Sequence, residues 1–202
     1  MPQPPPNSIE VKSREEWRDW LVNNHSSSTG IWLITYKKAS NPDLHLTQDE
    51  IVEEALCFGW IDSKPAKLDD ARTMLYISPR KPKSLWSALN KKRALKMIEQ
   101  SKMTELGLAA IELAKQSGTW DALNPVDSLT IPDDLEMEFE KFPNAKTNFQ
   151  SFPPSAQRGI LEWILQAKTP QTRTKRIENT AELASQNIRA NQWKKPIPSS
   201  EE

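Results

Sequence analysis

The segments with strand character all come before Pro82, and from Ser84 onward the sequence has helical periodicity. The expected strands are Gly30–Tyr36, Trp60–Lys64 and Thr73–Ser78, which are short and rich in β-branched and aromatic residues. Three strands are too few to be stable alone, so helices must cover the sheet. We therefore predict an α+β fold, with a small, mainly antiparallel sheet covered by helices and an all-α C-terminal segment after it.

Two capping boxes predict helices beside this sheet. Ser13–Glu16 has the spacing of such a box and opens a helix that ends near Asn24. Thr47–Glu50 opens a second helix, which Gly59 terminates. Both boxes precede apolar residues at helical spacing, so each helix has one face to bury.

Three later helices have apolar stripes that predict their buried faces. We take Ser84 as the cap of the first helix, Thr104 as the start of the second and Thr169 as the cap of the last. The expected buried residues are Leu85, Trp86, Leu89, Leu95 and Ile98 in the first, Leu106, Ala109, Ala110, Leu113 and Ala114 in the second, and Ile177, Ala181, Ala184 and Ile188 in the last.

Proline placement suggests where the chain divides. Asn124-Pro125 and Ile131-Pro132 bound a stretch that we expect to be extended, since the residue before a proline resists helix. The expected organisation is a disordered tail 1–8, an α+β domain 9–123, a linker 124–132, a helical region 133–193 and a disordered tail 194–202. Within the helical region we expect helices at 133–141, 145–151 and 154–167 before the last one.

Composition excludes several kinds of chemistry. The chain has two His and one Cys, so it lacks the four soft ligands of a structural zinc site, and we expect no metal and no cofactor. Cys57 follows an apolar helix segment, where a free cysteine is usually a buried hydrophobe. The start of the chain lacks a secretory signal and no run of 18 apolar residues occurs, so we expect a cytoplasmic protein without a membrane span.

The net charge is zero, with 27 basic and 27 acidic residues, but the charges are unevenly placed. Residues 80–102 contain eight basic residues and one acidic residue, and six acidic residues lie between Asp127 and Glu140. We favour a pairing of these two segments inside one molecule. The alternative is that 80–102, together with the basic residues of 168–176, binds the phosphates of a nucleic acid.

One constellation near the strand ends is a candidate ligand site. Alternation puts Trp60 and Asp62 on one face, Arg80 follows the neighbouring strand, and Trp86 and Asn90 share one side of the next helix. The candidate ligand-binding residues are Trp60, Asp62, Arg80, Lys81, Trp86, Ser87 and Asn90. The same residues could instead form an Asp–Arg pair and an Asn that tie the hairpin to the helix, and spacing alone leaves both interpretations open.

The eight tryptophans divide between core and candidate site. Trp17, Trp20, Trp32 and Trp163 fall on expected core faces, and Trp120 and Trp193 lie near helix ends. Only Trp60 and Trp86 belong to the candidate site.

These motifs resemble a known family. The series Gly59-Trp60-Ile61-Asp62-Ser63, then Ser78-Pro79-Arg80-Lys81, then Trp86-Ser87-x-x-Asn90 is similar to the YdeI/OmpD-associated family, also described as bacteriocin-protection proteins. Phe152–Ser155, Trp163 and Lys168–Ile177 resemble that family's OmdA-type C-terminal segment. Ser101-Lys102-Met103 departs from the family's usual Gly-Arg-Met. The resemblance implies stress or bacteriocin tolerance and a link to an outer-membrane porin, and it attaches no reaction, cofactor or substrate.

Three functional hypotheses follow. The first is a non-enzymatic cytoplasmic binding protein that contributes to stress or bacteriocin tolerance, with a small anionic ligand at Arg80 and a protein partner such as the porin. The second is a nucleic-acid-binding protein that uses the two basic segments. The third is an enzyme of unknown reaction at Asp62 and Arg80, which ranks last because one carboxylate seldom completes a mechanism.

Overall fold

The computed structural model describes residues 3–192, so Trp193 and the tail from 194 lie outside the described residues. The chain forms two compact units, Met1–Ala122 and Leu123–Glu202. We call them unit 1 and unit 2.

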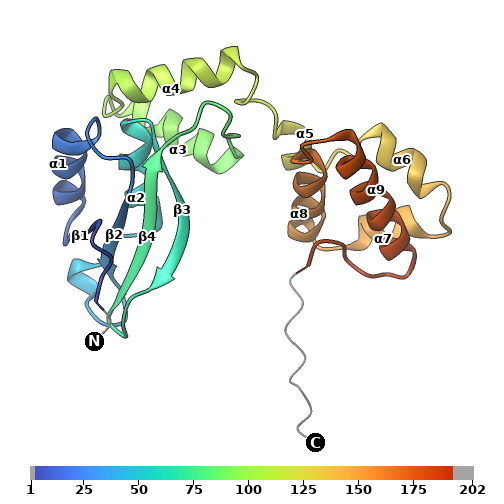
Figure 1. Ribbon diagram of the computed structural model, residues 1–202, viewed down its shortest axis with the longest axis horizontal. Coiled ribbons are helices and arrows are strands. Elements are labelled where there is room, and N and C mark those ends of the chain that lie inside the picture. The colour runs from blue at the N-terminus through green and yellow to red at the C-terminus, as the bar shows by residue number, and fades with distance from the viewer. Residues whose placement is uncertain (1–2, 193–202) are drawn as a thin grey trace, which may run out of the picture. The chain divides into compact units, whose positions relative to one another are not determined.

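Unit 1 contains a four-stranded sheet (Figure 1). Its strands are β1 (Ser8–Glu10), β2 (Ile31–Tyr36), β3 (Trp60–Lys67) and β4 (Arg72–Pro79), in the order β1-β2-β4-β3. The pairs β2–β4 and β3–β4 are antiparallel, and β1 pairs with β2 in parallel. The predicted α+β class and mainly antiparallel sheet are confirmed. Strand β1 was not predicted, because three residues are too few to show an alternating pattern.

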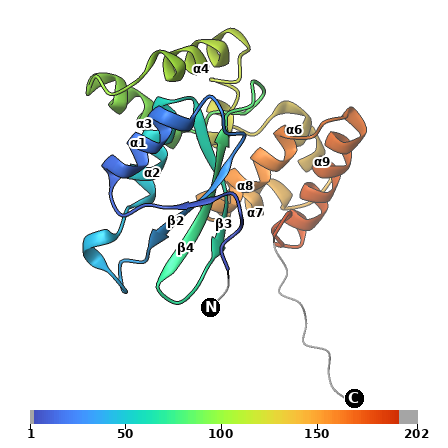
Figure 2. The ribbon, with the colours of Figure 1, turned by 60° about the vertical axis from the view of Figure 1, so that its left-hand side comes forward.

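Both segments predicted as capping boxes begin helices that cover one face of the sheet (Figure 2), although the Glu16 carboxylate accepts from the Lys12 amide rather than from that of Ser13. The Ser13 hydroxyl caps α1 (Arg14–Asn24), and Thr47 and Glu50 form the complete capping box of α2 (Gln48–Cys57). A short 3₁₀ turn, η1 (Pro42–Leu44), precedes α2. Gly59 adopts φ +72°, a backbone conformation that glycine tolerates at a helix end. The core between helices and sheet includes Trp17, Leu21, Leu33, Ala55, Trp60 and Ile77.

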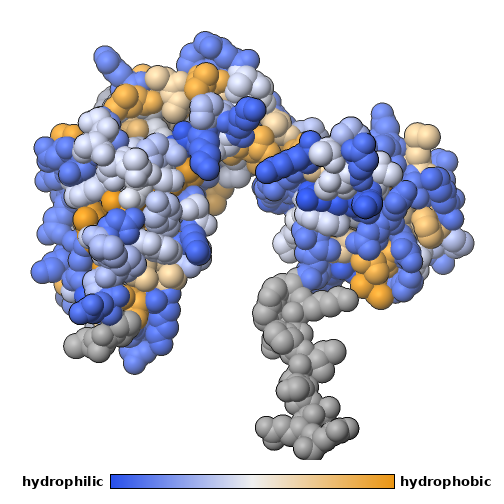
Figure 3. Space-filling model, in the orientation of Figure 1, coloured by the Kyte–Doolittle hydropathy of each residue, from blue (hydrophilic) through white to orange (hydrophobic). Residues whose placement is uncertain are grey.

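The next two helices bury largely different residues from those predicted, although Trp86 and Ala114 are buried as predicted. The Ser87 hydroxyl, not Ser84, caps α3 (Ala88–Glu99), so Leu85 and Trp86 precede the helix. The buried residues of α3 are Ala94 and Met97, and those of α4 (Glu105–Gln116) are Gly107, Ile111 and Ala114. The predicted core residues Leu89, Leu95, Ile98, Leu106 and Leu113 are exposed. Figure 3 shows hydrophobic residues exposed over α4.

Close approach between helices explains this choice of face. A Cβ atom at Gly107 would lie 2.5 Å from the Cys57 carbonyl oxygen and 2.8 Å from that of Leu56, so α4 lies directly against the end of α2. Only a small residue fits at such a contact, and the bulky leucines of α4 are therefore turned away from it.

The turn between α3 and α4 requires positive φ at a residue other than glycine. Ser101 has φ +55°, and the amides of Lys102 and Met103 both donate to the Met97 carbonyl, at 3.0 and 3.2 Å. A tight turn is thus present although this chain has serine there, at a cost of roughly 1 kcal/mol relative to glycine.

Two adjacent glutamates of α2 are buried and bind three cations. Glu54, 1% exposed, accepts from Arg14 Nε at 2.6 Å and from Arg18 Nη1 at 2.5 Å. Glu53, 2% exposed, pairs with Lys96 of α3 through Oε1, while its Oε2 lies 3.1 Å from Arg14 Nη2 without hydrogen-bond geometry. Burial alone would lower the pKa of Arg14, but its bond to Glu54 raises that pKa above the ordinary value. This network joins α1, α2 and α3.

In the described part of unit 2, residues 123–192, all the regular secondary structure is helical. Its helices are α5 (Asn124–Asp127), α6 (Asp133–Phe139), α7 (Ala145–Ser151), α8 (Pro154–Leu165) and α9 (Pro170–Ser185). The segment 124–127 is helical rather than extended, because Pro125 occupies the first turn, where its missing N–H costs no helical bond. Thr169 caps α9, and Ile177, Ala181 and Ala184 are buried as predicted. Ile188 lies beyond the end of α9 and is 46% exposed, so that prediction was wrong.

We expect Glu54→Ala to lower the free energy of unfolding by roughly 3 kcal/mol, because Arg14 and Arg18 lose their shared buried partner. Asp70→Ala, which breaks an exposed pair with Lys67, is the control and should leave the urea midpoint unchanged. Urea denaturation followed by circular dichroism measures both, and equal midpoints for the two variants would contradict the structural role of the network.

Candidate binding site

Arg80 is held against an aromatic ring rather than extended into solvent. Its backbone amide donates to the Gly59 carbonyl at 2.9 Å, and its guanidinium carbon lies 3.9 Å from the centre of the Trp86 ring. Arg80 Nη2 also donates to the Leu85 carbonyl at 2.9 Å. Burial lowers the pKa of Arg80 to about 10, and the charge of Asp62 opposes this shift. Arg80 thus remains cationic at neutral pH.

Trp60 and Asp62 share one face of β3, as predicted, but their side chains contact different residues. Trp60 is 2% exposed, and its ring lies edge-on to Trp20 at 5.9 Å. Asp62 Oδ2 accepts a hydrogen bond from Gln48 Nε2 at 3.1 Å. Asp62 is close enough to Arg80 for their charges to interact, but no hydrogen bond joins these two side chains.

The remaining predicted site residues have local contacts. The Ser87 hydroxyl accepts from the Asn90 amide at 3.3 Å, and Asn90 Oδ1 accepts from Arg93 Nη1 at 2.8 Å. Lys81 is exposed. Asn90 therefore helps to order the first turn of α3.

The predicted constellation is divided between two core clusters. Trp60 belongs to the cluster between the sheet and α1 and α2, whereas Trp86 packs with residues of α2, α3 and α4. Each of the two rings is 2% exposed, so neither presents a face to a ligand in this structure. A ligand-binding role for the predicted residues stays a prediction.

A second tryptophan extends the stack from Trp86 toward the surface. The Trp86 and Trp120 rings lie 4.9 Å apart, and the Trp86 amide donates to the Thr119 carbonyl at 3.2 Å. Lys91 Nζ and Lys115 Nζ lie 5.7 and 5.9 Å from the centre of the Trp120 ring. A cation–π and aromatic series thus runs from Arg80 through Trp86 to the half-buried Trp120.

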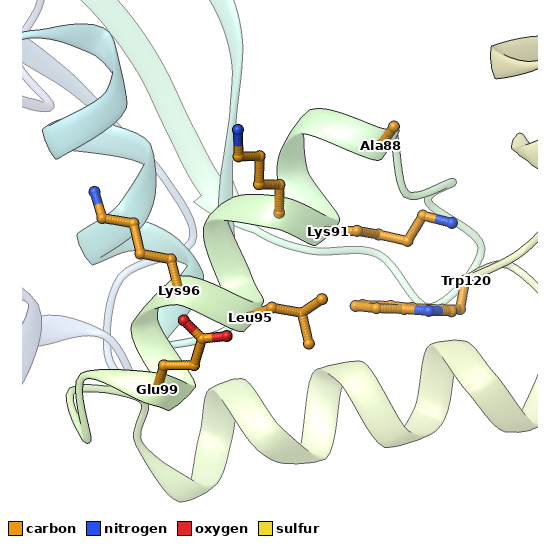
Figure 4. Close-up of a pocket in the computed structure, with 7 residues that line it drawn as sticks. Ala88, Lys91, Leu95, Lys96, Glu99 and Trp120 are labelled. Carbon is orange, nitrogen blue, oxygen red and sulfur yellow. The ribbon is translucent and has the colours of Figure 1, made fainter.

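Trp120 lines a hollow of about 680 Å³ beside α3 (Figure 4). Lys91 and Leu95 lie next to the Trp120 ring, while Lys96 and Glu99 lie farther along α3. We call this hollow the α3 groove. Its lining residues are Ala88, Lys91, Lys92, Leu95, Lys96, Glu99 and Trp120.

The charged residues of the α3 groove differ in how they are paired. Lys91 lies 3.7 Å from Asp121, and Lys96 pairs with the buried Glu53. Lys92 is exposed and makes no ion pair of 4 Å or less within residues 3–192, although its charge helps to lower the pKa of Asp49. It lines the groove three residues before Leu95, which is 51% exposed.

Trp120 is not predicted as a site residue from the sequence, because it lies just after the helix stop at Gly118, where no periodicity assigns it a face. The available signal was a large aromatic residue next to a helix end, which by itself indicates only where the helix stops.

The acidic segment has ion-pair partners inside unit 2. Asp134 accepts from Arg173 at 2.6 Å, Glu138 from Lys141 at 2.7 Å, and Glu136 pairs with Lys146. These three acids thus have partners within unit 2. Their ion pairs give no support to the expected pairing of the acidic segment with residues 80–102.

Several cations proposed for nucleic acid are already engaged. Arg173 is bound by Asp134, and Arg176 donates to the Trp163 carbonyl with its guanidinium 4.9 Å from the Trp163 ring centre. In α3, Arg93 pairs with Asp49. A phosphate would have to compete with these partners.

Cys57 is fully buried, and burial raises the pKa of its thiol to about 11. The His25 and His45 rings each contact a backbone carbonyl at 2.8 Å, those of Leu21 and Tyr36. Within the described part of the chain, no group of three or more His, Cys, Asp or Glu residues is arranged to hold a metal ion.

A protein-family profile described as "Domain of unknown function (DUF8412)" matches residues 9–110, which are 102 of the 202 residues. The chain belongs to this family. The DUF8412 match includes Arg80, Trp86, Lys92 and Leu95, and it ends before Trp120.

A second profile, described as "Bacteriocin-protection, YdeI or OmpD-Associated", matches residues 128–187. The predicted resemblance to that family is confirmed for this segment of unit 2, while the Gly59–Ser63 and Ser78–Asn90 motifs lie in the DUF8412 region. No curated protein and no solved structure matches the chain. Between residues 3 and 192, no helix combines the length and apolar character needed to cross a membrane.

We expect Arg80→Ala to lower the free energy of unfolding by roughly 2 kcal/mol, because a desolvated cation–π contact and a bond to a carbonyl are lost. Lys81→Ala, one residue along and exposed, is the control and should not change stability. Urea denaturation measures both, and an Arg80→Ala variant as stable as its control would show that the stack does not hold the fold.

Proposed function

We propose that the chain is a non-enzymatic binding protein that takes an anionic ligand with an apolar part in the α3 groove. The observation that carries this proposal is the exposed Leu95 beside the Trp120 ring, in a hollow that is also lined by Lys92, which makes no ion pair within residues 3–192. A ligand there would cover apolar surface and neutralise Lys92 in the same contact.

The Trp120 wall of the groove is held in place by buried residues. Trp120 packs on Trp86, which also contacts the Arg80 guanidinium, and the Trp86 amide donates a hydrogen bond to the Thr119 carbonyl. A wall that is already ordered loses little conformational entropy when a ligand binds, which favours affinity. The predicted residues Arg80 and Trp86 would then act as the support of the site rather than as its surface.

We propose a function without catalysis because the candidate acids and bases lie apart or are hydrogen-bonded to other residues. Asp62 is bound to Gln48, and the acidic residue that lines the α3 groove is Glu99, without a histidine or second carboxylate in the lining. A single carboxylate seldom completes acid–base catalysis.

The match over residues 128–187 supports a proposed role in bacteriocin or stress tolerance. The proposed setting is the cytoplasm, in accord with a single cysteine that is buried as a thiol. A porin partner rests on the printed family name alone and is the least supported part of the proposal.

The fluorescent anion anilinonaphthalene sulfonate (ANS) combines flat rings with a negative charge and serves as the probe. We expect the full chain to bind it, and Leu95→Ser and Lys92→Glu to weaken binding by roughly fivefold each, since each removes one part of the contact. The matched control is Leu89→Ser, on the same helix and 54% exposed but outside the groove lining. Fluorescence titration measures the affinities. Equal loss in Leu89→Ser, or no loss in the groove variants, contradicts the proposed site.

A cellular measurement tests the tolerance role. In cells that depend on this protein for survival of a bacteriocin challenge, Leu95→Ser should lower survival, whereas Leu89→Ser should not, at equal protein levels in the cytoplasmic fraction. Full survival with Leu95→Ser, or recovery of the protein outside that fraction, rejects this part of the proposal.

A further inference from the structure

The α3 groove follows a whole helix rather than one turn. Its lining positions in α3 are 88, 91, 92, 95, 96 and 99, which is the repeat of a single continuous helix face. Eleven residue steps along a helix span about 16 Å. A small molecule would contact one or two turns of such a surface, and an elongated ligand would contact all three.

We propose that the occupant of the α3 groove is an acidic amphipathic helix of a partner protein, three to four turns long, lying along α3. This inference rests on the proposed binding function and adds the class of its ligand. Such a helix would place its apolar side chains against Leu95 and Trp120 and its carboxylates beside the lysines.

The apolar part of the groove has the spacing that helix packing uses. Ala88 and Leu95 are seven residues apart on the same face, both exposed, and Trp120 borders Leu95. Ile98, at 37% exposed, follows Leu95 by three residues. The sequence pattern predicts burial for Leu95 and Ile98, and a partner helix would supply the cover that unit 1 does not.

The charge of the groove selects an acidic partner and gives it a direction. Lys91 and Lys92 lie toward the N-terminal end of α3 and Glu99 at its last turn. Carboxylates of the partner would therefore lie beside Lys92, and a neutral or basic residue beside Glu99.

A nucleic acid fits this surface less well. One unpaired lysine and one half-buried ring line the groove, whereas strand binding uses several phosphate contacts and several stacked bases. The observations therefore favour a protein helix.

The test uses the full chain and a fluorescein-labelled peptide about four turns long, with leucines along one face and glutamates on the flanks. Fluorescence anisotropy should show binding that weakens as salt rises. A scrambled peptide of the same composition, which lacks an apolar face, and a version with lysine in place of glutamate should each bind at least roughly tenfold more weakly.

Variants locate the contact. Leu95→Ser and Lys92→Glu should each weaken binding of the acidic peptide by roughly tenfold, and Leu89→Ser should leave it unchanged. Equal binding of the scrambled peptide, full displacement by a single-stranded oligonucleotide, or a change of oligomeric state in Leu95→Ser by sedimentation would each overturn the inference.

The two proposals fail differently. If ANS binds and the groove variants weaken it but no acidic peptide binds, the binding site stands and the helical partner is wrong. If neither ANS nor the peptide responds to Leu95→Ser, both proposals fail.

Discussion

Burial of two adjacent carboxylates in α2 is the constraint on which the helical layer of unit 1 depends. Glu53 and Glu54 are nearly inaccessible, and charges in such a place are tolerated only when cations reach them. Arg14 and Arg18 come from α1 and Lys96 from α3, so neutralising the two acids fixes both helices against α2. The rotation of α3 is set in this way, and with it the face that α3 turns outward.

The outward face of α3 becomes the candidate site. With Ala94 and Met97 toward the core, the residues from Ala88 to Glu99 that line the groove point the other way. The series from Arg80 through Trp86 then holds Trp120 beside that face. The buried residues Arg80 and Trp86 thus hold Trp120 in place, while the exposed residues of α3 form the surface of the groove.

Local signals predicted most of the elements. Ser13, Thr47 and Thr169 begin helices because their hydroxyls accept from backbone amides three residues on, and this chemistry is visible in the sequence. Contacts between distant segments were not visible. Periodicity shows that α3 and α4 have apolar stripes. The close approach of Gly107 to α2 decides which face of α4 is buried, and the pair of Lys96 with Glu53 orients α3. The buried glutamates resemble ordinary surface charges in sequence, and their three partners are far along the chain.

Amide hydrogen exchange of the full chain, with and without the acidic peptide, most directly tests whether the outer face of α3 is the binding surface. Helix α3 has an open outer face while its inner face is anchored to α2 by the Lys96–Glu53 pair. We expect exchange to slow in residues 88–99 and around Trp120 and to stay unchanged in the sheet and in unit 2. Protection confined to the sheet or to unit 2, with α3 unaffected, would contradict it.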